Sequence, residues 1–295
     1  MHEKCVLEVA TKGKIRMNVK VMLSAVSFAV LAATGVCAPA AVEVKAPSPA
    51  PVQWQGLKVG VLGDSITDPR QGHRIYWQYL SAWLGWDVKV YGVSGHKWSN
   101  IPGQTDRMEK EMGDAVDAIL IFIGTNDYCA GLPLGKWYEE KEGAVNWWGK
   151  ERTLKQRAFS RDTKTVRGMI NVALERLKKR YPDSQIVLLT PTKRAFFQCS
   201  PTNVQPAEDW PNTAGLYLDD YVKCVREAGQ IWSCPVIDLF GESGFLPCTE
   251  GYAKYVRNAK SDGLHPNGLG HERLARLIYH RLSALPGTFR TCTGK

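Results

Sequence analysis

The sequence predicts an α/β protein built on a doubly wound parallel sheet with helices on both faces. An apolar run from Leu57 to Leu62 is typical of a buried strand, and Gly63 and Asp64 end it. A second run, Ala118–Ile123, is apolar at every position, as expected for a central strand covered on both faces. Strand patterns alternate with helical patterns along the rest of the chain, which favours a single parallel sheet.

The predicted elements follow this alternation from about Gln55 onward. The first helical pattern places Ile75, Tyr79 and Trp83 on one face. Residues 128–157, 191–213 and 241–261 show no clear periodicity and are predicted as irregular segments or loops. We predict strands at residues 57–63, 87–93, 118–123, 185–190 and 235–240, and helices at about 73–84, 101–112, 162–180, 216–228 and 262–282.

The first 40 residues have the features of a secretory signal peptide. Basic residues between Lys12 and Lys20 precede an apolar stretch, and Ala38-Pro39-Ala40 supplies a cleavage site. Residues 41–55 are proline-rich and are predicted to be a linker, so residues 56–295 are expected to fold as one domain with an insertion at 128–157. We expect an exported protein, periplasmic or secreted, without stable membrane insertion after cleavage. Lipid anchoring at Cys37 is the alternative.

Charge and cysteine content bear on partners and compartment. The 295 residues carry a formal charge of +9, and the first 40 contribute five Lys/Arg and two Asp/Glu, which leaves +6. This modest excess is spread along the chain, so nucleic acid is not expected as a partner. Six cysteines follow residue 40, and for an exported protein we expect at least one disulfide within Cys199–Cys292. Neither C-x-x-C nor H-E-x-x-H spacing occurs, so no metal site is predicted.

Polar residues follow three predicted strands at their carboxyl ends: Ser65, Gly95 and Asn126. In a parallel sheet these ends share one edge, where α/β proteins bind ligands. Asp262 and His265 are close enough in sequence for the carboxylate to accept the imidazole Nδ1–H. Together the five residues can supply the nucleophile, base, orienting carboxylate and oxyanion donors of ester hydrolysis. The plainer alternatives are a helix cap at the serine, a positive φ at the glycine, a turn at the asparagine and a surface histidine.

Four blocks of the sequence resemble those of the SGNH (GDSL-type) hydrolase superfamily. They are Gly63-Asp64-Ser65-Ile66, Gly95, Gly124-Thr125-Asn126-Asp127 and Asp262-x-x-His265, in the family's order. The resemblance implies a flavodoxin-like three-layer α/β/α sandwich with a five-stranded parallel sheet, and a serine esterase without metal or cofactor. It implies Ser65 as nucleophile, His265 as base and Asp262 as the orienter of that base. The oxyanion hole would be the N–H groups of Ser65 and Gly95 with the side-chain amide of Asn126.

Substrate-binding residues are predicted from their neighbourhood in the sequence. Asp64 and Asp127 belong to two of the four blocks, and His96 adjoins Gly95. The segment after Asn126 mixes aromatic and charged residues, a composition that suits a rim of the site on which sugar rings stack. The alternative is a lid that packs on its own aromatic side chains. Its candidate substrate-binding residues are Trp137, Trp147 and Trp148.

No long apolar segment follows the signal peptide, as a fatty-acyl tunnel would require. We therefore expect a small-molecule or carbohydrate ester as substrate, with a short acyl group such as acetyl. The alternatives are a lipase or phospholipid-directed hydrolase and a non-catalytic carbohydrate-binding protein.

Overall fold

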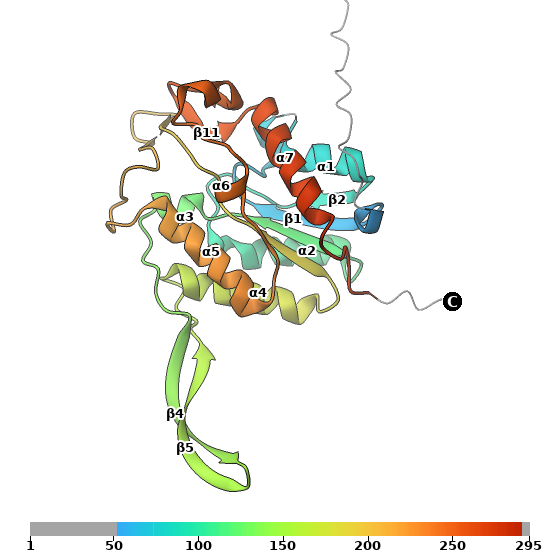
Figure 1. Ribbon diagram of the computed structural model, residues 1–295, viewed down its shortest axis with the longest axis vertical. Coiled ribbons are helices and arrows are strands. Elements are labelled where there is room, and N and C mark those ends of the chain that lie inside the picture. Colours follow the sequence, from blue (N-terminus) through green and yellow to red (C-terminus); the bar gives the residue numbers. More distant parts are fainter. Residues whose placement is uncertain (1–51, 73, 291–295) are drawn as a thin grey trace, which may run out of the picture. The chain divides into compact units, whose positions relative to one another are not determined.

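A five-stranded parallel sheet lies at the centre of the computed structural model, which describes residues 52–72 and 74–290 (Figure 1). The strand order is β2-β1-β3-β6-β9, and each neighbouring pair is parallel. The predicted α/β fold with five parallel strands is confirmed. Its strands are β1 (Lys58–Gly63), β2 (Asp87–Val90), β3 (Ala118–Phe122), β6 (Gln185–Leu189) and β9 (Val236–Ile237).

Helices cover both faces of this sheet and make the three layers. Along β3, Leu120 and Phe122 enter one hydrophobic core, whereas Ile119 and Ile121 enter the other. Successive side chains of a strand point to opposite faces, so a wholly apolar strand supplies two cores at once. One core lies under α1 (Tyr76–Leu84) and α7 (Gly268–Leu282), and the other under α2 (Ile101–Met112), α4 (Val166–Arg180) and α5 (Leu218–Trp232).

Local sequence explains where these helices pack and begin. Helix α2 approaches β1 closely because residue 60 is glycine, and a Cβ there would collide with the sulfur of Met108. Helix α4 begins after Thr165, whose hydroxyl accepts the Gly168 N–H, and three basic residues occupy its last turn. Helix α7 begins after Asn267, whose side chain accepts two N–H groups of the first turn.

A second sheet forms beside the first and carries part of the site. It is antiparallel, with the order β10-β11-β7-β8. The prediction that residues 262–267 open the last helix is wrong, because Asp262 pairs with Phe197 in a strand and the helix begins at Gly268. Pro266 explains the difference, since the residue before a proline is driven toward extended backbone. The strands are β7 (Phe197–Gln198), β8 (Val204–Gln205), β10 (Val256–Asn258) and β11 (Asp262–Pro266).

The segment predicted to be irregular is a long hairpin, β4 (Tyr138–Trp147) and β5 (Lys150–Phe159). The two strands pair only with each other in the described chain, and Figure 1 shows the ribbon extending away from the layers. Trp148 and Gly149 form a two-residue turn in which both have positive φ, 58° and 76°. Such a turn matches the twist of the flanking strands.

The remaining short helices are α3 (Thr125–Cys129) and α6 (Leu239–Glu242), with 3-10 turns at Val52–Trp54, Pro69–Gln71, Trp98–Asn100 and Glu250–Tyr255. The predicted signal peptide at 1–40, Cys37 and most of the linker lie outside the described residues, as does His73. Within residues 52–72 and 74–290, no helix is long and apolar enough to span a bilayer.

The predicted disulfide is not found among the described residues. Buried Cys224 belongs to helix α5, and buried Cys234 follows that helix, so both pack as small apolar side chains in the core. Cys292 lies outside the described residues. The free thiols are Cys129, Cys199, Cys224, Cys234 and Cys248.

Candidate active site

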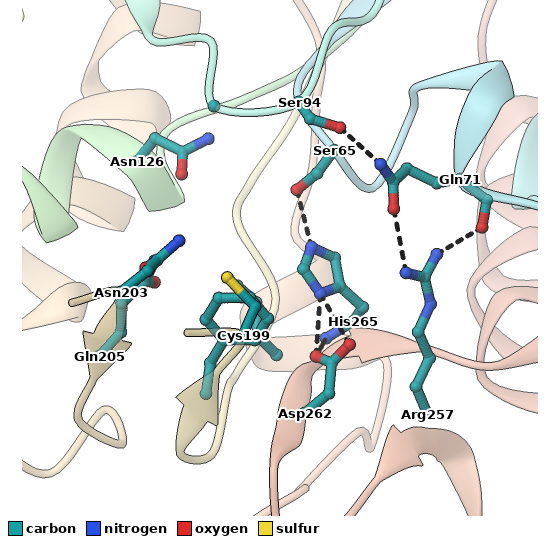
Figure 2. Close-up of a pocket in the computed structure, with 13 residues that line it drawn as sticks. Ser65, Gln71, Ser94, Asn126, Cys199, Asn203, Gln205, Arg257, Asp262 and His265 are labelled. Atoms are coloured by element: carbon teal, nitrogen blue, oxygen red, sulfur yellow. Dashed lines mark hydrogen bonds and ion pairs between the residues drawn. The ribbon is translucent and has the colours of Figure 1, made fainter. Parts of the chain in front are cut away.

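Ser65, His265 and Asp262 form a continuous line of hydrogen bonds at the edge of the parallel sheet (Figure 2). Ser65 lies in the turn after β1, and the other two lie on β11. His265 Nε2 is 2.9 Å from Ser65 Oγ, and His265 Nδ1 is 2.8 Å from Asp262 Oδ1. Because a carboxylate only accepts, Nδ1–H donates to Asp262, and Nε2 is left to accept the serine proton.

The Asp262 carboxylate is stabilised in its ionised form. Burial raises its pKa, but hydrogen bonds from the His265 ring and backbone outweigh that effect and hold the pKa below its usual value. The His265 N–H donates to Asp262 Oδ1 at 3.0 Å, so one carboxylate fixes both the strand and the ring. Phe197 packs against the imidazole with ring centroids 5.2 Å apart and planes at 75°. These contacts hold the ring toward Ser65.

Three groups that could stabilise an oxyanion border the same cavity: the N–H groups of Ser65 and Gly95, and the Asn126 amide. Neither backbone N–H has an acceptor among the described residues. Gly95 has φ of +81°, a conformation that side chains disfavour, which explains the glycine there. Asn126 Nδ2 donates to the His96 carbonyl at 2.9 Å. This bond orients the amide and leaves its second hydrogen for a ligand.

None of the predicted residues Asp64, His96 and Asp127 lines the cavity, and Asp64 and Asp127 are buried. Asp64 accepts the N–H two residues onward at 3.0 Å, and Asp127 accepts the Trp98 N–H at 3.3 Å. Burial raises the pKa of both carboxyls to about 7. The His96 ring contacts Gln104 Nε2 through Nδ1 at 2.9 Å. These contacts hold the loops around the cavity, and the position of the three residues in or beside the blocks does not place them in its lining.

Comparison with known families agrees with this geometry. The model of the GDSL-like lipase/acylhydrolase family matches residues 61–273, a range that contains Ser65, Gly95, Asn126, Asp262 and His265. The chain belongs to this family. Membership makes it an ester hydrolase and confirms the resemblance to SGNH (GDSL-type) hydrolases.

Solved structures share the fold of this GDSL-family chain. One is 26% identical and covers 79% of this chain and 99% of its own, with a TM-score of 0.62. A protein from Lactobacillus plantarum is 22% identical, with coverages of 78% and 98% and a TM-score of 0.59. A possible lipase from Chitinophaga pinensis is 19% identical, with coverages of 77% and 98% and a TM-score of 0.54. No curated protein matches the chain.

The cavity beside the five motif residues has a volume of about 380 Å³. Most of its other lining residues come from segments predicted as loops, and no motif marks them. Pairing of Asp262 with Phe197 brings the β7–β8 hairpin to the site, and this contact joins positions far apart in sequence. In the described chain, no group of three or more metal-ligating side chains is placed to hold an ion. The additional lining residues are Gln71, Ser94, Phe197, Cys199, Asn203, Gln205, Arg257 and Leu264.

The structure does not bring Trp137, Trp147 or Trp148 to the cavity. Trp147 and Trp148 lie at the turn of the β4–β5 hairpin and are 53% and 91% exposed. Trp137 lies at the hairpin's base, where its Nε1 donates to Glu227 Oε2 at 2.7 Å. The expectation that the segment after Asn126 borders the site fails because the hairpin pairs with itself and carries its turn away.

Proposed function

We propose that this chain is a serine esterase that removes short acyl groups, acetyl above all, from carbohydrate-like alcohols through an acyl-enzyme. The observation that carries the proposal is the hydrogen-bonded line from Ser65 through His265 to Asp262 beside a cavity. Family membership supplies ester hydrolysis, and the three-residue line supports the serine mechanism.

The geometry supports two displacement steps. Ser65 Oγ attacks the acyl carbon while His265 Nε2 takes its proton, and Asp262 stabilises the resulting imidazolium. The oxyanion meets the N–H groups of Ser65 and Gly95 and the free amide hydrogen of Asn126. The ester C–O bond then breaks, and the imidazolium protonates the departing alcohol. A water molecule, deprotonated by the same imidazole, attacks the acyl-serine and frees the carboxylic acid and the serine hydroxyl.

The number of hydrogen-bonding side chains around the cavity supports a polar substrate. The large apolar side chains of the lining are Phe197 and Leu264, and amide, hydroxyl or charged groups make up most of the rest. A long acyl chain gains its affinity from contiguous apolar surface, whereas a sugar requires hydrogen-bonding groups around it. This lining therefore favours a short acyl group on a polyol over the lipase alternative.

Export is part of the proposal and is supported by the N-terminal sequence pattern alone. Expression of the full chain should yield a mature protein beginning near Ala41, outside the cytoplasm. Mass spectrometry of fractionated cells measures this directly. Full-length protein confined to the cytoplasm would contradict export without affecting the esterase.

A fluorophosphonate probe tests the serine mechanism. The native protein should be labelled once, at Ser65, and Ser65→Ala should take up no label. Ser65→Ala and His265→Ala should each lower kcat on 4-nitrophenyl acetate by about 10³-fold or more. Ser99→Ala is the matched control, because Ser99 is exposed and does not line the cavity. Near-normal turnover by folded Ser65→Ala would end the proposal.

Nitrophenyl esters of increasing chain length test the acyl group. Rates should be highest for acetate and fall sharply beyond butyrate, because overpacking a small site costs about 1–3 kcal/mol. Release of acetate from acetylated xylan or acetylated pectin tests the alcohol. A maximum at octanoate would favour the lipase.

A further inference from the structure

We propose that Arg257, an exposed residue of the cavity lining, forms an anion subsite, so that the preferred ester carries a carboxylate near the scissile bond. Because the subsite selects among esters of one active site, this inference rests on the proposed function and names its substrate class. Arg257 lies on β10, five residues before Asp262, and lines the same cavity as Ser65 and His265. Figure 2 shows its side chain rising beside the Asp262–His265 pair.

The Arg257 guanidinium is held in place by neutral groups. Its Nη1 donates to Gln71 Oε1 at 3.0 Å, and its Nη2 donates to the Gln71 carbonyl at 2.7 Å. An arginine has five N–H donors, and the remaining three have no acceptor among the described residues. Within the described chain its polar contacts are with Gln71 alone, and no described carboxylate forms an ion pair with it. The two bonds to Gln71 fix the side chain. Its charge helps to lower the pKa of nearby Asp262, but the guanidinium keeps donors free for a ligand.

The charges around the cavity leave Arg257 available to an anion. The one carboxylate in the lining, Asp262, accepts hydrogen bonds from the His265 ring and backbone. The Asp262 oxygens are occupied by these hydrogen bonds, so Arg257 is the charged group of the lining that still has donors for a ligand. A guanidinium binds a carboxylate through paired, charge-assisted hydrogen bonds, and amide-rich walls suit the rest of a sugar.

A chain of hydrogen bonds links this guanidinium to the loop that carries Gly95. Gln71 Nε2 donates to Ser94 Oγ at 2.8 Å, and Ser94 Oγ donates to Asp68 Oδ2 at 2.9 Å. The Ser94 N–H donates to the same Asp68 oxygen at 2.9 Å, and Asp68 is fully buried. Since the network is formed before substrate arrives, a carboxylate docking on Arg257 loses little affinity to side-chain ordering. It would also be held at a fixed distance from the oxyanion donors.

Matched ester pairs that differ only in charge test the subsite and locate the anion. 3-Acetoxybenzoate and 3-acetoxybenzamide place the charge on the alcohol, and the monoethyl ester of succinate and ethyl succinamate place it on the acyl group. In at least one pair, native kcat/KM should be about tenfold higher for the carboxylate, in keeping with a charge-assisted bidentate contact. Arg257→Gln should bring that ratio to about 1, and Arg257→Lys should leave it intermediate.

Arg281→Gln is the matched control for net charge. Arg281 is half-exposed on α7, pairs with Glu242 at 3.3 Å and does not line the cavity. Arg281→Gln should leave the kcat/KM ratio of the charged and neutral esters unchanged. If the preference came from the long-range field of the protein's net charge, both variants would lower the ratio, whereas a direct contact is lost only in Arg257→Gln. Equal rates within both native pairs, or a ratio preserved in folded Arg257→Gln, would overturn the subsite.

Binding without turnover separates the subsite from the chemistry. Calorimetry on Ser65→Ala should find that glucuronate binds at least about fivefold more tightly than glucuronamide, and that adding Arg257→Gln removes the difference. Equal binding of the two ligands refutes the subsite even if ester hydrolysis by Ser65 is established. Conversely, turnover that persists in Ser65→Ala refutes the serine mechanism, while a glucuronate preference that depends on Arg257 would still support the subsite.

Discussion

The side-chain amide of Asn126 has two hydrogens, and the folded chain uses one of them. That hydrogen is donated to the His96 carbonyl at 2.9 Å, in the turn that follows Gly95. The amide is thereby oriented before any substrate binds. A donor fixed in advance costs no reorganisation when charge develops on the substrate, which is why such donors have large effects on rate.

Asn126→Ala removes this donor and should lower kcat by about 10²–10³-fold, equivalent to about 3 kcal/mol of barrier. KM should change little, because the donor acts on the oxyanion rather than on the ground-state ester. Steady-state kinetics on 4-nitrophenyl acetate gives both values, and thermal melting verifies folding. Asn146→Ala, at an exposed position of the β4–β5 hairpin, is the matched control. A kcat within threefold of native for Asn126→Ala would exclude the amide from the oxyanion hole.

The elements predicted best from sequence are those whose signal is local. The strand predicted at 118–123 is Ala118–Phe122, and the one predicted at 185–190 is Gln185–Leu189. Helix α2 occupies Ile101–Met112, as predicted. Each carries its own apolar pattern, since each is buried against a layer on at least one face. The motif residues lie at the ends of such elements, which is why the sequence could predict that Ser65 and Asn126 border one cavity.

Elements that depend on distant partners could not be predicted in this way. Strands β7 and β8 are two residues each, and the site's β11 pairs across more than 60 positions with Phe197. No periodicity can develop over two residues. Strands β4 and β5 are long but almost wholly exposed, so neither face carries an apolar pattern. The place of Arg257 could not be predicted for the same reason, because only pairing of β10 with β11 puts that arginine beside Asp262 and His265 at the cavity.

Shortening the hairpin should leave the chemistry intact. Replacing residues 140–157 with Asn-Gly joins Glu139 to Ala158, which already face each other across the ribbon. The base is retained, where Phe159 stacks on Tyr138 and on Trp232 at centroid distances of 5.4 and 4.2 Å. We expect kcat/KM on neutral acetates within about twofold of native and little change in Tm, since the removed residues contact mainly one another. A tenfold loss of kcat/KM would show that the hairpin takes part in substrate binding.

Across the whole molecule, buried ionisable groups make opposing contributions to stability. Burial raises the pKa of Asp64 and Asp127 from the ordinary 3.8 to about 7. Between these two pH values the folded chain keeps both carboxyls protonated, whereas the unfolded chain releases both protons. The contribution of these two carboxyls to stability is lost as pH rises toward 7.

Burial lowers the pKa of His271 from 6.5 to about 3. Between these two pH values the unfolded chain binds a proton on this imidazole that the folded chain does not bind. The contribution of His271 is lost as pH falls below about 6.5.

His271→Phe isolates the histidine contribution from the other two. The His271 ring is buried and stacks on Tyr76 with centroids 6.3 Å apart and planes at 24°, an arrangement that a phenyl ring can keep. Its Nδ1 has no hydrogen-bond partner in the described chain, so the substitution removes no hydrogen bond at that atom. Between pH 8 and pH 5, native protein should lose up to about 2 kcal/mol more unfolding free energy than the variant, at 1.4 kcal/mol per pH unit below 6.5. Urea denaturation at the two pH values measures this difference, and the pH 8 comparison removes the packing effect of the larger ring. Parallel pH dependence in the two proteins would show that His271 binds its proton in the folded state as readily as in the unfolded one.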